Sequence, residues 1–334
     1  MQAWQVIAHG EPTSSDALVL RDVAVPEPGP GQILVKVRAT AANFPDVLMI
    51  RGGYQERPDF PFTPGVELCG DVVALGPGVA GFSVGERVMG TTLLPHGGYA
   101  DYAIIDATFT YPVPKGLDDA EAAGFLIAYQ TSWFALHRRT NLQAGETLLV
   151  QAAVGGVGSA AVQLGKAAGA RVIAVVGGPD KAKIAADLGA DVVIDRKSED
   201  VVAAVKAAAP KGVDVVYDPV GGASYAQAIK CIGFEGRILV IGFAGGEIPQ
   251  AALNHVLVKN YSVIGLHWGL YRQRKPSVIE ECQAALVPLA ESGAIKPLVG
   301  ERHSLAEVPA ALARLAAGAT VGRVVYVAEE QHTD

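Results

Sequence analysis

The most regular feature of the sequence is an alternation of short apolar runs with longer amphipathic runs over the segment 145–266. The apolar runs are "TLLVQA", "RVIAVVG", "DVVIDR", "VDVVYD", "GRILVIG" and "YSVIGL". The segments between most of them have the spacing of apolar residues that is typical of helices. Strands that alternate with helices predict right-handed crossovers and a six-stranded parallel sheet covered on both faces. The nearly continuous apolar character of the runs fits strands that are buried on both sides.

The segment before this alternation has a different pattern. Short runs such as "QILVKVRA", "DVVALG" and "YADYAIID" are separated by clusters of proline and glycine, which predicts a β-rich region. One helix is expected there, at "FPDVLMIRG". After the alternation come two helical segments, "SVIEECQAALVPLAESG" and "LAEVPAALARLAAG", and a strand, "RVVYVA". We expect this last part of the chain to return to the first region and complete it.

Composition narrows the class of protein. Half of the 334 residues are hydrophobic and 18% are charged, so a large core can be buried. The net charge of −7 argues against nucleic acid and against anionic membranes as partners. The first residues lack the features of a signal peptide, and no segment reaches the roughly 18 apolar residues of a membrane span. The three cysteines show no metal-ligand spacing, so reduced thiols and a cytoplasmic location are expected.

A glycine-rich turn, "AAVGGVG", joins the first apolar run of the alternation to the helix that follows it. Against the pattern G-x-G-x-x-G, the matching residues are Ala153, Gly155 and Gly158, with alanine in the first place. Glycines at these places let the backbone turn tightly and approach a pyrophosphate, while the helix N-terminus presents N–H groups to the phosphates. A strand before, a helix after and a second strand at the right distance favour dinucleotide binding over a turn that serves packing alone.

The end of the second strand indicates which dinucleotide is bound. An NAD site usually has an acid there, about 20 residues after the glycine turn. Here the strand ends in two glycines, the second of which is Gly178, and Asp180 is interpreted as the cap of the next helix. Lys181 and Arg196 are placed to pair with a 2′-phosphate, although either one could be an ordinary surface charge. The sequence therefore favours NADPH.

Together with these motifs, several stretches resemble one family over nearly the whole chain. They include "NFPDVLMIRGGY", "PFTPGVELCGDVVALGPGV", "IAYQTSWFAL", "VVYDPVGG" and "GRVVYV". The chain resembles the zinc-free quinone oxidoreductase (zeta-crystallin-like) branch of the medium-chain dehydrogenase/reductase superfamily. The resemblance implies an α/β protein with a GroES-like, β-rich catalytic domain at 1–125 and 268–334. It implies a Rossmann NADPH-binding domain with a doubly wound, six-stranded parallel sheet at 126–267. A homodimer is also expected by resemblance, formed at the edge strand "YSVIGL".

The resemblance also assigns residues to the cofactor. Each lies in a stretch quoted above, at or just after the end of the second strand, or in the "GF" that follows "GRILVI". The assigned residues are Tyr129 and Thr131 at the nicotinamide end; Ala153, Gly155, Gly156, Val157 and Gly158 at the pyrophosphate; Gly178, Lys181 and Arg196 at the 2′-phosphate; Phe243 on the nicotinamide side, with the "GLHWG" segment; and Arg323, where the family often has a lysine near the cofactor.

The metal ligands of the zinc alcohol dehydrogenases in this superfamily are missing from the corresponding stretches. "ATAANFPD" has no cysteine, and Val66 stands where the zinc enzymes have histidine. No zinc is therefore predicted. Without a Lewis acid, the substrate must itself spread the negative charge that hydride addition creates. A quinone or a conjugated enone can do this, whereas a simple carbonyl cannot.

Candidate catalytic groups are few. Asn43 offers an amide, Tyr54 offers a phenol hydroxyl, and Asp46 could orient the other two. Alternatively, Asp46 caps or braces the helix and Tyr54 packs a loop. Glu67 is expected to make a structural bond.

Three functions follow as hypotheses. The leading one is an NADPH-dependent quinone reductase that acts without metal. The second is an enone or 2-enoyl-thioester reductase on the same scaffold. The third is a non-catalytic NADPH-binding protein, for which RNA is a poor partner because the chain is acidic.

Overall fold

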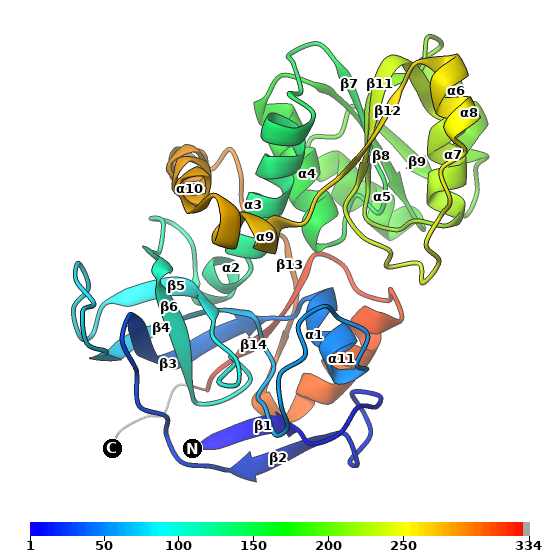
Figure 1. The fold of residues 1–334 in the computed structure, drawn as a ribbon. Coiled ribbons are helices and arrows are strands. Elements are labelled where there is room, and N and C mark those ends of the chain that lie inside the picture. The colour runs from blue at the N-terminus through cyan, green and yellow to red at the C-terminus, as the bar shows by residue number, and fades with distance from the viewer. Residues whose placement is uncertain (330–334) are drawn as a thin grey trace. The chain divides into compact units, whose positions relative to one another are not determined.

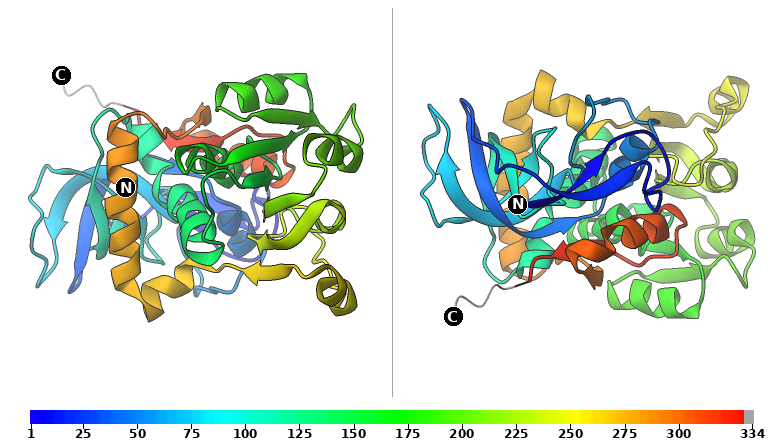
Figure 2. Two further views of the ribbon diagram at one scale, coloured as in Figure 1. Left: turned by 90° about the horizontal axis from the view of Figure 1, so that it is seen from above. Right: turned by 90° about the horizontal axis from the view of Figure 1, so that it is seen from below.

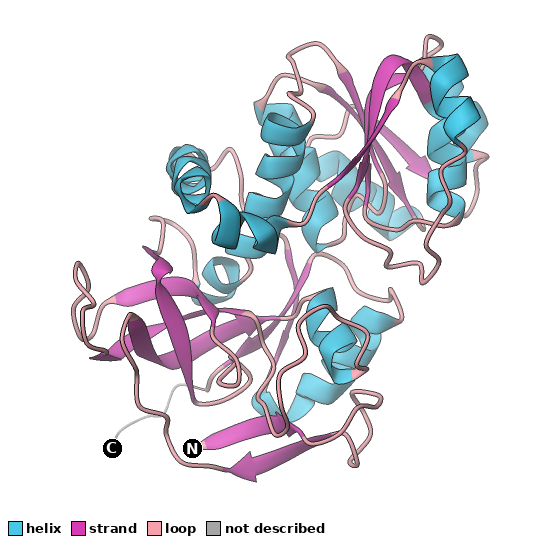
Figure 3. Cartoon of the chain, in the orientation of Figure 1, coloured by secondary structure: helices cyan, strands magenta, loops and turns pink. Residues whose placement is uncertain are grey.

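The computed structural model describes residues 1–329, which form two compact units (Figure 1). One unit consists of residues 1–127 and the chain from residue 299 onward, and the other consists of residues 128–298. The first unit has a two-stranded and a six-stranded sheet, the second has one six-stranded sheet, and both have helices, as Figure 3 shows by colour. No helix among the described residues is both long and apolar enough to cross a lipid bilayer.

The second unit is built on the six-stranded parallel sheet that the sequence predicts. Its strands are β7 (Thr147–Val150), β8 (Arg171–Val176), β9 (Val192–Asp195), β10 (Val213–Asp218), β11 (Ile232–Val240) and β12 (Ser262–Gly265). The strand order is β12-β11-β10-β7-β8-β9, so the chain starts in the middle of the sheet and winds outward in both directions. This is the doubly wound arrangement of the Rossmann fold.

Helices cover both faces of this sheet (Figure 2). They are α4 (Gly156–Ala167), α5 (Pro179–Asp187), α6 (Val201–Ala208), α7 (Ala223–Cys231) and α8 (Leu253–Lys259). Leu148 and Leu149 are neighbours on β7, so their side chains point to opposite faces. Leu148 packs beneath α4, where a β-carbon on Gly165 would lie 2.6 Å from its Cδ2 atom. Leu149 belongs to a core cluster that includes Val205 of α6 and Ala228 of α7.

Four further helical segments belong wholly or mainly to the second unit. They are α3 (Leu126–Trp133), the π-helix η1 (Phe134–Arg139), α9 (Trp268–Arg274) and α10 (Pro276–Glu291). The sequence predicts that residues 268–298 lie with the first domain, whereas the structure places them in the second unit. Buried polar contacts explain the difference. Trp268 Nε1 donates to Gln130 Oε1 at 3.1 Å, and Gln130 Nε2 donates to Gln283 Oε1 at 3.0 Å.

The first unit is β-rich, as predicted, and both ends of the described chain contribute to it. Its strands are β1 (Gln2–Val6), β2 (Leu18–Asp22), β3 (Gln32–Ala41), β4 (Glu67–Leu75), β5 (Arg87–Thr92), β6 (Tyr102–Pro112), β13 (Val299–His303) and β14 (Arg323–Val327). Strand β3 pairs with both β4 and β6, so β3, β4, β5 and β6 close into a ring. Strand β14 pairs antiparallel to β3, which confirms that the end of the chain returns to this unit.

The helices of the first unit are few and short. They are α1 (Phe44–Ile50), α2 (Asp119–Ala123), the 3₁₀ turn η2 (Leu305–Glu307) and α11 (Val308–Ala316). Helix α1 lies where the sequence predicts it. Its Val47 and Ile50 share a core cluster with Leu312 of α11. Because α1 packs on this core, the residues at its start are held in a fixed place beside the sheet.

Candidate functional site

The glycine turn after β7 has the backbone geometry of an anion site. Ala152 adopts a left-handed conformation with φ of 49°, and the Ala153 N–H donates to the Val175 carbonyl of β8 at 3.1 Å. Gly155 is the N-cap residue of α4, and no side chain caps the helix. The first backbone N–H groups of α4 therefore have no partner inside the helix. Together with the helix dipole, they form a site suited to a phosphate.

The glycines of the turn differ in what they permit. A β-carbon on Gly158 would lie 2.2 Å from the carbonyl oxygen of Ala152, which no side chain can occupy without moving the backbone. A β-carbon on Gly155 would lie 3.3 Å from the same oxygen, so the contact is much milder there. Glycine at 158 thus lets α4 begin directly against the end of β7. The carbonyl of Val157, in the same turn, accepts a hydrogen bond from Ser132 Oγ at 3.1 Å.

Gln151, at the end of β7, is a polar group that the sequence did not single out. Its side chain is 3% exposed, and its amide nitrogen has no hydrogen-bond partner among the described residues. A buried amide without a partner costs free energy unless a bound group satisfies it. Its position next to the turn is consistent with a polar ligand at this strand end.

The end of β8 brings positive charge together. The guanidinium of Arg196 lies beside Gly177, whose β-carbon would be 3.2 Å from an Arg196 nitrogen. Lys197, which the sequence analysis did not consider, lies near Gly178, with its ammonium nitrogen 3.8 Å from the place of that residue's β-carbon. The pKa of Lys181 is lowered, first by partial burial and then by the charges of Arg196 and Lys197. Such a group of cations favours a multiply charged anion.

Two acids near this cluster have structural roles. Asp195, the last residue of β9, accepts hydrogen bonds from the N–H groups of Gly178 at 2.7 Å and Lys197 at 2.9 Å. These bonds lower the pKa of Asp195 and hold the two loops together. The interpretation of Asp180 as a helix cap is wrong, because Gly178 is the N-cap residue of α5 and Asp180 lies in the first turn. An acid there still interacts favourably with the helix dipole.

The residues predicted at the nicotinamide end lie on α3 and in the loop after β11. Tyr129 is buried, and its hydroxyl donates to Gln163 Oε1 at 3.1 Å. Thr131 lies on α3, one helical turn after residue 128, where the second unit begins, and the residue is 9% exposed. Phe243 follows β11, and its ring lies close to Gly221. No measurement on this chain tests a role in cofactor binding for these three residues, which stay predictions.

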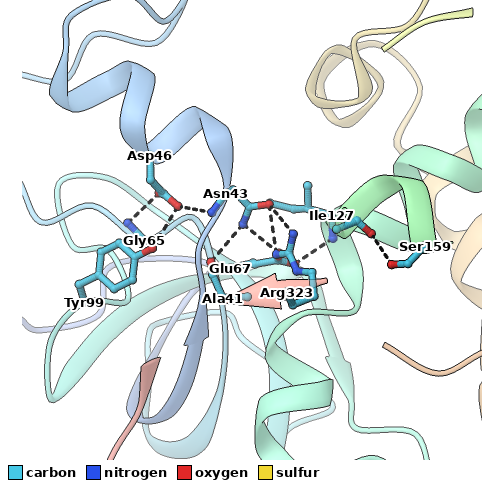
Figure 4. A network of polar contacts seen from close by, with 10 residues as sticks. Ala41, Asn43, Asp46, Gly65, Glu67, Tyr99, Ile127, Ser159 and Arg323 are labelled. Atoms are coloured by element: carbon cyan, nitrogen blue, oxygen red, sulfur yellow. Dashed lines mark hydrogen bonds and ion pairs between the residues drawn. The ribbon is translucent and has the colours of Figure 1, made fainter. Parts of the chain in front are cut away.

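A buried polar network in the first unit joins Asn43, Asp46, Glu67 and Arg323 (Figure 4). Asp46 accepts from the Asn43 N–H at 2.8 Å, from the Gly65 N–H at 3.0 Å and from the Tyr99 hydroxyl at 3.3 Å. It therefore braces the start of α1, which is one of the two interpretations that the sequence allowed.

Glu67 is the centre of the other half of the network. Its carboxylate accepts from Asn43 Nδ2 at 2.9 Å and from the Ile127 N–H at 2.9 Å, and it forms a short ion pair with Arg323. The two terminal nitrogens of Arg323 each donate to Asn43 Oδ1 at 3.2 Å. The Asn43 amide also donates to the Ala41 carbonyl at 3.1 Å. Both the amide of Asn43 and the guanidinium of Arg323 are thus engaged inside the unit.

Tyr54 differs from the other two catalytic candidates. It lies in the loop after α1, is partly buried against the core, and no hydrogen bond joins its hydroxyl to another described residue. Burial raises its pKa, and the nearby charges of Glu56 and Asp46 raise it further. A neutral phenol that keeps its proton is suited to donate a hydrogen bond.

Burial is the main influence on the pKa values of Asp46 and Glu67, the two acids of the network. It raises the pKa of Asp46 from 3.8 to about 7, against the lowering effect of the hydrogen bonds from Asn43 and Gly65. Burial also raises the pKa of Glu67, although Arg323 opposes that shift.

The fold does not bring possible metal ligands together among the described residues. Among residues 1–329, no three His, Cys, Asp or Glu side chains form a group that could hold a metal ion. Cys69, the cysteine of "PGVELCG", is buried, and burial raises its pKa to about 12. These donors do not fit a zinc centre, because zinc needs three or four grouped ligands and the described donors form no such group.

The raised pKa of Asp46 predicts how stability depends on pH. A carboxyl group whose pKa is higher in the folded state stabilises the fold below the unfolded pKa. This stabilisation is lost as the pH rises through the folded pKa, here between about 4 and 7. In urea unfolding, the free energy of unfolding of the wild type should therefore exceed that of Asp46→Asn by more at pH 5 than at pH 8. We expect the gap between the two proteins to shrink by roughly 2–3 kcal/mol from pH 5 to pH 8. The same substitution at the exposed Asp22 serves as the control. An equal gap at both pH values would contradict the titration assigned to Asp46.

The chain was compared with protein families and with known proteins. Residues 29–115 match the profile described as "Alcohol dehydrogenase GroES-like domain", and residues 156–284 match the profile described as "Zinc-binding dehydrogenase". The quinone oxidoreductase-like protein 2 of Bos taurus is 36% identical over 310 residues, which cover 92% of this chain and 88% of that protein.

Two further proteins show how widely the fold is used. The Escherichia coli quinone oxidoreductase, solved in complex with NADPH, has a TM-score of 0.89 and 28% identity, covering 98% of this chain and 100% of that one. A mycocerosic acid synthase-like polyketide synthase of Mycobacterium tuberculosis is 31% identical over 303 residues. These are 89% of this chain and 14% of the synthase.

The two profiles match the two units in turn, and the relatives cover almost the whole chain. With its GroES-like unit, its Rossmann sheet and its glycine turn, the chain is an oxidoreductase that belongs to the quinone oxidoreductase family of the medium-chain dehydrogenases/reductases.

Proposed function

We propose that the protein is an NADPH-dependent quinone reductase that needs no metal ion. We further propose that it works in the cytoplasm. The observation that carries the proposal is the group of Lys181, Arg196 and Lys197 beside the two glycines at the end of β8. Cations at this strand end, where an NAD enzyme usually has an acid, fit a 2′-phosphate. The E. coli relative solved with NADPH supports the same cofactor.

The residues of the second unit fit the rest of this cofactor. The uncapped start of α4, with Gly156, Val157 and Gly158, would hold the pyrophosphate. Gly158 provides the space for this, because a side chain there would collide with the backbone of Ala152. The buried amide of Gln151, which lacks a partner among the described residues, would gain one from a bound group. We place Tyr129, Thr131 and Phe243 at the nicotinamide end, as the resemblance implies.

The chemistry requires little more than orientation and one hydrogen-bond donor. When bound, NADPH supplies a hydride, and with one added proton a quinone becomes a hydroquinone. We propose that the Tyr54 hydroxyl donates to the oxygen on which negative charge develops. Asn43 and Asp46 would act as positioning residues, since their polar groups already bond within the first unit. Arg323 would stabilise Glu67 and Asn43, and its assigned place near the cofactor stays a prediction.

A second acceptor class has support from one relative. The chain is similar to a protein named as a mycocerosic acid synthase-like polyketide synthase, and a 2-enoyl thioester is the alternative acceptor that the sequence analysis kept open. Reduction of a 2-enoyl thioester also delocalises the negative charge, onto an enolate, although less than the aromatic anion formed from a quinone. The fold does not decide between these acceptors.

The choice of acceptor can be measured directly. With NADPH, the purified protein should reduce a benzoquinone or naphthoquinone with a kcat/KM at least about tenfold above that for a simple enone or crotonyl thioester, a difference of about 1.4 kcal/mol in activation free energy. Treatment with EDTA should leave the rate unchanged, because no zinc centre is proposed. Turnover of the thioester alone would support the second candidate and reject quinone reduction. Loss of activity on chelation would reject the metal-free mechanism.

Cofactor selectivity tests the cluster at the end of β8. Lys181→Ala should raise the KM for NADPH by roughly tenfold and change the KM for NADH much less, because the lost ion pair involves only the 2′-phosphate. Lys183→Ala is the matched control. That lysine lies on the same helix, is highly exposed and pairs with Asp187. Equal effects of Lys181→Ala on both cofactors would remove its proposed role.

A homodimer is part of the proposal. Strand β12 is at the edge of the second sheet, pairs only with β11 among the described strands, and exposes Val263. Helix α8, which precedes it, has no buried residue and exposes Leu253, Leu257 and Val258. An unpaired edge with apolar side chains around it is a surface on which two copies can associate.

The dimer prediction has a matched pair of substitutions. Val263→Glu should shift the mass measured by light scattering from two chains toward one, since it puts a charge into the proposed interface. Val84→Glu changes an exposed valine of the first unit and should leave the mass unchanged. A monomeric wild type, or a dimer unaffected by Val263→Glu, would contradict this interface.

A further inference from the structure

Charge is distributed unevenly along this acidic chain. Asp and Glu make up 34 of the 334 residues, yet neither occurs between Glu121 and Glu146 or between Glu247 and Glu280. The two acid-free segments contain six of the 27 lysines and arginines, namely Arg138, Arg139, Lys259, Arg272, Arg274 and Lys275. A net charge of −7 therefore says little about the potential around these segments.

The fold joins one part of each acid-free segment. The guanidinium carbon of Arg138, on η1, lies 6.0 Å from the ring centre of Tyr271, on α9. The Phe134 ring lies 4.4 Å from the same ring. Arg139 Nε donates to the Gly265 carbonyl, just before α9, at 3.3 Å. The end of η1 and helix α9 thus lie against each other within the second unit.

This surface combines cations with exposed apolar groups. Arg138, Arg139, Arg274 and Lys275 are exposed, and α9 has no buried residue. Leu270 is 44% exposed on the same helix. Trp268 is partly exposed, and the guanidinium of Arg272 lies 6.0 Å from its ring centre. We use the term basic aromatic surface for Arg138, Arg139, Trp268, Leu270, Tyr271, Arg272, Arg274 and Lys275.

We propose that the basic aromatic surface docks on an anionic phospholipid surface, as a peripheral contact. A short helix with cations, tryptophan, tyrosine and an exposed leucine has the composition of a segment that lies at the lipid–water interface. Each cation near such a surface adds to the attraction, which acts over about one Debye length. Glu280 and Glu281, which are exposed on α10 just after this surface, oppose the attraction, whereas acids more than a Debye length away are screened. This inference does not rest on the reaction proposed above, although Trp268 also belongs to the "GLHWG" segment that the resemblance places on the nicotinamide side.

The ring contacts favour lipid over single-stranded nucleic acid. Nucleic-acid surfaces use open aromatic faces on which bases stack. Here arginines lie near the Trp268 and Tyr271 rings, and Phe134 packs against Tyr271. An exposed leucine among cations has no partner on a phosphate backbone, whereas it can enter the acyl region of a bilayer.

Vesicle flotation of the full chain tests the proposal. With vesicles of phosphatidylcholine containing about 30% phosphatidylglycerol at about 50 mM salt, the wild type should float with the lipid. It should not do so with pure phosphatidylcholine, and binding to the anionic vesicles should fall steeply at about 500 mM salt. The double substitution Arg274→Glu with Lys275→Glu should reduce partitioning by at least about tenfold.

A matched control separates the surface from the net charge. Lys206→Glu with Lys211→Glu changes two exposed lysines of the same unit, and it changes the net charge from −7 to −11, as the first double substitution does. It should leave partitioning unchanged. Leu270→Ser keeps every charge and should weaken partitioning several-fold, because the apolar contact is lost. Thermal unfolding of each variant shows that it is folded.

Four results would overturn the proposal. They are no binding to anionic vesicles, equal loss in the two double variants, no effect of Leu270→Ser, or preferential binding of a single-stranded RNA oligomer in the same salt. The last result would identify the surface as a site for nucleic acid.

Discussion

The second unit depends on one constraint, which is that the parallel strands of a sheet all end at the same edge. The glycine turn follows β7, the paired glycines follow β8, and Arg196 and Lys197 follow β9. These segments are separated by tens of residues in the chain, but the strand order brings the ends of β7, β8 and β9 next to one another. A phosphate site can form there because backbone N–H groups, a helix dipole and cations meet at one edge of the sheet. The strand order alone brings these loops together.

The first unit depends on a different kind of interaction, the burial of charge. Glu67 and Arg323 are almost completely buried and pair with each other, and Asn43 bonds to both. Asp46, also buried, is held by two backbone N–H groups and a tyrosine hydroxyl. Buried charges of this kind rarely add stability, because removing them from water costs as much as their attraction returns. They do fix the positions of the groups that they bind, since a buried carboxylate or guanidinium must keep its hydrogen-bond partners in place. The Asp46 carboxylate thereby holds the start of α1, and the Glu67 carboxylate holds the Ile127 N–H.

The average charge of a protein is a poor guide to its partners. The negative net charge predicts that the protein avoids anionic surfaces. That prediction assumes that the charge is spread evenly over the protein surface. In this chain the acids are excluded from two segments that the fold places side by side at η1 and α9. Screening limits each charge to its surroundings, so the potential at this surface depends more on the nearby cations than on the net charge of the chain.

The sequence by itself determined the two-part architecture, the parallel sheet and the glycine turn. Apolar periodicity and glycine spacing follow from contacts near in the chain, and these survive in any tertiary context. Only the tertiary structure decided which groups meet. It showed Lys197 beside Gly178, the amide of Gln151 that lacks a partner among the described residues, the ion pair between β4 and β14, and the place of residues 268–298 with the second unit. It also showed that Gly178, and not Asp180, caps α5. Each of these depends on the exact packing of side chains or on residues far apart in the chain, which local pattern cannot encode.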